Sequence, residues 1–105
     1  MRSTQWSRRF ELRADVWFRT SRDADWRTGV SLSVSTTDAI VESDDLPSTS
    51  DAIAVVIALS DSGCLVGQGR VTLSEPSAGP ETPARFTIAV DHYAIEHREA
   101  VLSHS

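Results

Sequence analysis

Residues 8–18 have the sequence RRFELRADVWF, and the rest of the chain is best understood from this stretch. Apolar side chains occupy alternate positions from Phe10 to Phe18, and the positions between them are mostly charged. An alternation of period two is typical of a β-strand with one buried and one solvated face. The solvated parity carries Arg9 and Arg13, so we expect both guanidinium groups on one side of the strand, about 13 Å apart along it. This arginine pair is a candidate half of an anion site.

The rest of the chain consists of short strand-like segments separated by turn signals. We expect strands over residues 10–20, 28–35, 39–42, 52–59, 65–73 and 84–90. Gly67 and Gly69 within the fifth strand indicate sharp curvature or a close backbone approach, which favours a barrel over a sandwich. Residues 92–102, after Asp91, contain no Gly or Pro and predict a short helix. The predicted fold is therefore all-β: a small six-stranded antiparallel β-barrel with a short C-terminal helix.

Length and composition predict one soluble domain. The 105 residues suffice for a single core, which we expect over residues 8–105, preceded by a flexible arm at residues 1–7. The single cysteine, Cys64, has no partner for an internal disulfide. The first residues contain no apolar h-region, and the longest apolar run, residues 52–59, is too short to cross a bilayer. We therefore expect a cytoplasmic protein with no membrane insertion.

The charge is unevenly distributed along the chain. Residues 1–27 contain seven arginines and four acids, a net charge of +3, whereas residues 28–105 contain three arginines and eleven acids, a net charge of −8. The overall charge of −5 argues against long nucleic acid as a partner, because phosphate neutralisation dominates that affinity. A local basic end can still hold a small anion.

The second predicted strand adds hydroxyl groups to the arginine pair. Ser31, Ser33 and Ser35 alternate with three apolar residues, so we expect the hydroxyls to form one exposed stripe beside the guanidinium groups. Cations and hydroxyls together suit a phosphodiester and the edge of a guanine.

These elements resemble the PilZ domain family over roughly residues 8–100. The resemblance consists of an Arg-x-x-x-Arg spacing at the entry to the first strand, then a strand, tight turn and short strand over residues 29–41 (GVSLSVSTTDAIV). A glycine-bearing strand, a final strand with Phe86 and a terminal helix complete it. PilZ domains are six-stranded barrels of bacterial signalling proteins that bind cyclic di-GMP through the arginine pair and an (Asp/Asn)-x-Ser-x-x-Gly turn. The resemblance implies cyclic di-GMP as a regulatory ligand, and no other cofactor.

The residue-by-residue match to this ligand motif is partial. Arg9 and Arg13 match the arginines, and Ser35 matches the serine. Ser33 replaces the Asp or Asn, and its hydroxyl lacks the bidentate edge that those side chains offer to guanine. Asp38 replaces the glycine and adds a negative charge where backbone approaches an anionic ligand. The implied ligand-binding residues are Arg8, Arg9, Arg13, Ser33, Ser35 and Asp38, with Arg8 assisting through charge alone.

Other interpretations of the same residues remain open. Arg9 and Arg13 are alternatively solvated strand charges paired with Glu11 or an acidic loop, and the serines are alternatively ordinary polar strand positions. The alternative function is a module of the same fold that has lost the nucleotide and binds a protein partner, through Trp17 and its acidic surface. Catalysis is not expected, because neither Cys64 nor the three histidines show the spacing of a nucleophile–base pair or a metal site.

Overall fold

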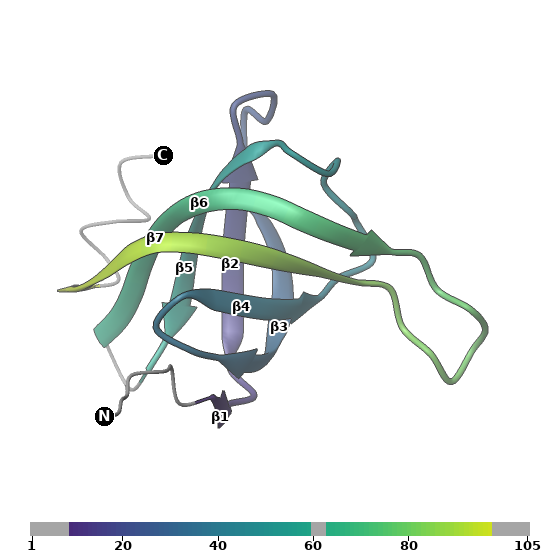
Figure 1. Cartoon of the computed structure of the whole chain (residues 1–105), viewed down its shortest axis with the longest axis horizontal. Coiled ribbons are helices and arrows are strands. Elements are labelled where there is room, and N and C mark those ends of the chain that lie inside the picture. Colours follow the sequence, from purple (N-terminus) through teal and green to yellow (C-terminus); the bar gives the residue numbers. More distant parts are fainter. Residues whose placement is uncertain (1–8, 60–62, 98–105) are drawn as a thin grey trace, which may run out of the picture.

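The computed structural model describes residues 9–59 and 63–97, and every described element is a β-strand (Figure 1). The strands are β1 (Phe10–Glu11), β2 (Asp15–Thr20), β3 (Arg27–Val34), β4 (Asp38–Glu42), β5 (Ala52–Ala58), β6 (Gly63–Glu75) and β7 (Arg85–His97). Antiparallel pairing follows the order β3-β2-β5-β6-β7-β4, and β4 pairs again with β3. Six strands therefore close into a barrel, and β1 lies outside the ring. The prediction of an all-β, six-stranded antiparallel barrel is confirmed.

The predicted first strand is interrupted. Phe10 pairs with Val34 and Glu11 with Ser33, whereas Asp15 pairs with Val30, so β1 and β2 lie along the same edge of β3. Three residues, 12–14, face only two residues of β3, which is a β-bulge. Phe10 was predicted to be buried, but it is 58% exposed, because β1 pairs with β3 alone and has no second neighbour among the described strands to cover it.

A second bulge changes the direction of the serines in β3. Ser31 pairs with Val41 of β4 and Ser33 pairs with the adjacent Ile40, so Leu32 is an extra residue that inverts the alternation. Cross-strand partners share a face, so Ser31 lies with the fully buried Val41, whereas Ser33 lies on the outer face. The prediction of one exposed serine stripe is therefore wrong. Ser33 and Ser35 are only 7% and 5% exposed, and Ser31, at 0%, lies on the inner face. Its hydroxyl instead donates to Leu12 O and accepts from Ala14 N at 3.0 Å, which ties the interrupted first strand to β3.

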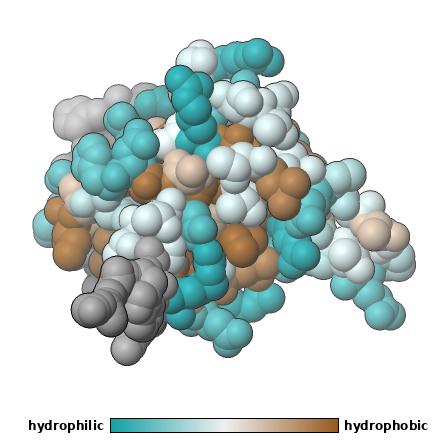
Figure 2. Space-filling view, viewed as in Figure 1, coloured by the Kyte–Doolittle hydropathy of each residue, from teal (hydrophilic) through white to brown (hydrophobic). Residues whose placement is uncertain are grey.

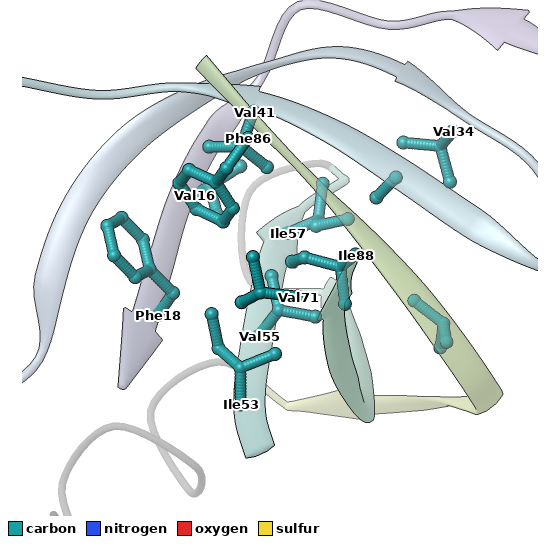
Figure 3. Close-up of a cluster of buried hydrophobic side chains, with 12 residues drawn as sticks. Val16, Phe18, Val34, Val41, Ile53, Val55, Ile57, Val71, Phe86 and Ile88 are labelled. Atoms are coloured by element: carbon teal, nitrogen blue, oxygen red, sulfur yellow. The ribbon is translucent and has the colours of Figure 1, made fainter. Parts of the chain in front are cut away.

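The barrel interior holds the hydrophobic core shown in Figure 3. Phe18 and Phe86 are fully buried and meet edge to face, with ring centroids 4.8 Å apart. Aliphatic side chains from β2, β4, β5, β6 and β7 fill the remaining space: Val16, Val41, Ile53, Val55, Ile57, Val71 and Ile88. Each alternates with outward residues along its strand, which is the pattern of a filled small barrel.

The two longest strands, β6 and β7, sweep across the barrel and end in a protruding hairpin loop over residues 76–84 (Figure 1). β7 runs to His97, so the predicted helix is wrong for residues 92–97, and residues 98–102 lie outside the described residues. Pairing with β6 explains the difference, because Cys64 faces Glu96 and Gln68 faces His92 in one continuous ladder. Cys64, which precedes the strand predicted over residues 65–73, is a buried residue of β6.

Close backbone approach explains one of the two glycines in β6. A Cβ atom on Gly69 would lie 1.8 Å from Ala89 O, so only glycine fits at this position. The approach coincides with a bulge: Gln68 pairs with His92 but Gly69 pairs with Val90, leaving Asp91 as the extra residue. The expectation of a close approach in this strand is confirmed.

Candidate functional site

A tight turn over residues 35–37 joins β3 to β4 and forms the floor of the site. The Ser35 hydroxyl accepts hydrogen bonds from Thr37 N at 3.2 Å and Asp38 N at 3.1 Å. It also donates to Asp38 Oδ1 at 3.0 Å, and Ser35 N donates to Asp38 O at 2.8 Å. Serine is suited to this place because its short hydroxyl can bond to backbone groups two and three residues ahead. The Val90 amide donates to Thr37 O at 2.8 Å and holds the turn against β7.

Arg9 lies over this turn and connects it to β3. Its guanidinium donates from Nη1 to the Ser33 hydroxyl at 2.7 Å, and its Nη2 forms an ion pair with Asp38 Oδ1. The Arg9 side chain is 42% exposed and that of Asp38 is 28% exposed, so solvent reaches the pair. The outward direction of Ser33, set by the Leu32 bulge, makes this contact possible. An Arg fork held by a hydroxyl and a carboxylate is a geometry that a phosphate can also satisfy.

Tyr93 of β7 completes the cluster from the other side. Its hydroxyl donates to Asp38 O at 3.1 Å, and burial together with the nearby Asp38 carboxylate raises its pKa to about 12. The Tyr93 ring passes over Gly67, where a Cβ atom would lie 3.2 Å from the ring. Sequence reasoning missed Tyr93 because it was placed in a helix. In the structure Tyr93 is paired with Gly67 of β6, and the extra residue Asp91 changes the alternation of β7 between Val90 and Tyr93.

Arg13 contacts a different residue of β4. Its Nη1 lies 3.6 Å from Glu42 Oε1, and the Arg13 side chain is 68% exposed. Asp38 and Glu42 are the first and last residues of β4, so the two arginines are anchored at opposite ends of a five-residue strand. Four residues of strand span about 13 Å, which is the separation predicted for the arginines themselves.

The structure therefore brings together four of the six predicted site residues: Arg9, Ser33, Ser35 and Asp38. Arg13 stands apart from them, and Arg8 lies outside the described residues. The alternative pairing of the arginines with Glu11 or an acidic loop is replaced by pairing with Asp38 and Glu42, which both belong to β4. The cluster has one cation and one anion, so its charge is balanced in this state.

An open groove of about 620 Å³ lies over β2, β5, β6 and β7, and none of the cluster residues lines it. Arg19 and Arg70 line it, and Arg19 also stacks on Trp26, with 4.5 Å between the guanidinium carbon and the ring centroid. Across residues 9–59 and 63–97, no group of three or more His, Cys, Asp or Glu side chains is arranged to hold a metal ion. The same residues include no helix long and apolar enough to span a membrane.

Comparison with known proteins assigns no family to this chain. No protein-family model matches the sequence, and neither a curated protein nor a solved structure gives a significant match.

Proposed function

We propose that this protein is a cytoplasmic, non-catalytic signalling module resembling a PilZ domain, and that it binds cyclic di-GMP at the cluster of Arg9, Ser33, Ser35 and Asp38. One observation carries the proposal: residues separated by up to 29 positions in sequence meet in one solvent-reached cluster around a guanidinium fork. These are positions at which the resemblance places ligand-binding residues.

Asp38 has a specific role in this proposal. Its carboxylate forms an ion pair with Arg9, in the place that a phosphate oxygen would take. A phosphodiester that reaches Arg9 must displace Asp38 or share the guanidinium with it. The ion pair is partly exposed and contributes about 0.2–1 kcal/mol, so displacement is within reach of a charged ligand.

Arg13 joins the ligand only after leaving Glu42. The Arg13–Glu42 contact is long, at 3.6 Å, and the arginine is mostly exposed, so this pair contributes little to stability. Cyclic di-GMP has two phosphates and two guanine edges, and it offers partners for both arginines. Binding would thus exchange two ion pairs within the protein for contacts with one ligand.

A second candidate function is an interaction module without nucleotide. The neutralised Arg9 favours it, because Asp38 already provides the anion that a ligand would bring. In that case the Arg9–Asp38 pair is a structural link between the β1 end and the β3–β4 turn, and the partner is another protein.

Calorimetric titration with cyclic di-GMP separates the two candidates. We expect heat of binding from the wild type, and loss of that heat in Arg9→Ala and in Arg13→Ala. Arg85→Ala is the matched control, because Arg85 is also an exposed arginine in an ion pair, 2.8 Å from Glu75, but lies outside the cluster. No heat from a folded wild type would reject nucleotide binding and favour the interaction module.

A further inference from the structure

Strand β7 continues well beyond its partner on one edge (Figure 1). β4 pairs with β7 only from Arg85 to Ala89, and the Val90 amide bonds to Thr37. From His92 to His97, β6 pairs with one edge, and among the described residues no strand pairs with the other. A strand edge of this kind presents backbone N–H and C=O groups that can accept another strand.

The side chains on this segment are complementary to themselves in one antiparallel register. If Ala94 faces Ala94 of the partner subunit, His92 faces Glu96 of the partner subunit and Tyr93 faces Ile95 of the partner subunit. The outermost residue, Asp91, then faces His97 of the partner subunit. An imidazole N–H opposite a carboxylate forms a hydrogen bond, and an aromatic ring opposite a β-branched side chain is a favourable cross-strand pair.

Neighbouring registers lose this complementarity. A shift by one residue in one direction places Asp91 opposite Glu96 of the partner subunit, a pair of like charges. The opposite shift places His92 opposite His97 of the partner subunit. The register about Ala94 is therefore specified by its neighbours on both sides, and each favourable pair occurs twice because the arrangement has two-fold symmetry.

The exposure of an apolar side chain on this segment agrees with an unpaired strand edge. Ile95 is 75% exposed, the highest value among the large exposed apolar side chains of the described residues. The face in Figure 2 shows hydrophobic surface as separate patches rather than one broad apolar area, which favours contact through a strand edge over contact through a flat face.

We propose that two copies of this chain associate edge to edge through Asp91–His97 of β7, in the antiparallel register centred on Ala94. The two barrels then share a continuous β-sheet across the two-fold axis. This association does not rest on nucleotide binding, because its contacts are the backbone edge and the cross-strand side-chain pairs of β7 itself.

Sedimentation equilibrium of the full chain over a range of concentrations tests the association. We expect a monomer–dimer equilibrium that Glu96→Arg weakens, since His92 of the partner subunit then faces a cation in place of a carboxylate. His92→Glu weakens it by placing two carboxylates opposite each other. The double variant His92→Glu/Glu96→Arg restores an attractive pair, in which the carboxylate is at position 92 and the cation is at position 96. Each single change should lower the association constant about tenfold, because the altered pair occurs twice in the dimer, and the double variant should recover most of that loss.

The matched control is Asp25→Arg, a carboxylate-to-arginine change at an exposed turn residue outside β7. It should leave the association constant unchanged. Amide hydrogen exchange gives a second measurement, in which exchange within residues 91–97 slows as protein concentration rises. A monomer at all concentrations, a dimer indifferent to Glu96→Arg, or a double variant no better than the single ones would each overturn the proposal. Protection of residues 91–97 that is independent of concentration would also overturn it, because another part of the same chain then covers the edge.

Discussion

Asp38→Asn removes the negative charge beside Arg9 while preserving the size of the side chain. The partly exposed Arg9–Asp38 pair contributes about 0.2–1 kcal/mol to folding, so we expect only a small loss of stability. For a domain of this length, that loss lowers the melting temperature by no more than several degrees.

The effect on cyclic di-GMP should be larger and of opposite sign. In the wild type, a ligand phosphate must compete with the Asp38 carboxylate for Arg9 and also approach that carboxylate. Two charges about 6 Å apart interact by about 1–3 kcal/mol at the effective dielectric constants of a protein surface. Removing the carboxylate should therefore tighten binding about tenfold, which corresponds to about 1.4 kcal/mol.

Calorimetric titration at about 50 mM and about 500 mM salt measures this change and its electrostatic origin. The advantage of Asp38→Asn over the wild type should shrink at high salt, because the screening length falls from roughly 14 Å to roughly 4 Å. Glu42→Gln is the companion variant, since it releases Arg13 in the same way. If Asp38→Asn keeps its fold but binds cyclic di-GMP no better than the wild type, Asp38 is not a competitor for the ligand, and our account of the site is wrong.

Two further predictions concern the barrel and its tyrosine. Gly69→Ala should destabilise the protein by about 1–3 kcal/mol in urea unfolding, because its methyl group would overlap the backbone at Ala89 O. Gly67→Ala should cost less, because its methyl group would meet only side-chain atoms, at 3.0 Å or more, and equal effects would contradict the close-approach explanation. Tyr93 is the only tyrosine, and its pKa is raised to about 12 from an unfolded value near 10. Its neutral form therefore stabilises the fold fully below pH 10, and this contribution disappears as the pH rises to about 12. Tyr93→Phe should remove that pH dependence of unfolding, and tyrosinate absorbance of the wild type near pH 10 in the folded state would refute the assignment.

The barrel itself was predictable from local pattern. Alternating residues across residues 15–20, the short apolar run at residues 39–41, and loops marked by proline and polar clusters specify strands wherever a single register holds. Those segments agree with β2 and β4, and the apolar run at residues 52–59 corresponds to β5. Gly69 also indicated a close backbone approach, because a strand interior has few other uses for glycine.

The residues of the candidate site were predictable by type, but their directions were not. Ser33 points toward Arg9 only because Leu32 of β3 is an extra residue in the pairing of β3 with β4. Ser31 points inward for the same reason. A bulge is a property of two paired strands, so it has no signal in one strand alone. The helix prediction failed at residues 92–97 because the ladder with β6, rather than local propensity, sets the conformation there.

The amino-acid pattern alone was enough to predict a small all-β domain and to name the arginines, serines and carboxylate available for an anion site. The three-dimensional arrangement was needed to show that Asp38 forms an ion pair with Arg9, that Arg13 lies beside Glu42, and that Tyr93 is hydrogen-bonded to Asp38. This division arises because strand periodicity is encoded over a few neighbouring residues, whereas ion pairs and bulges depend on the register between strands distant in the chain.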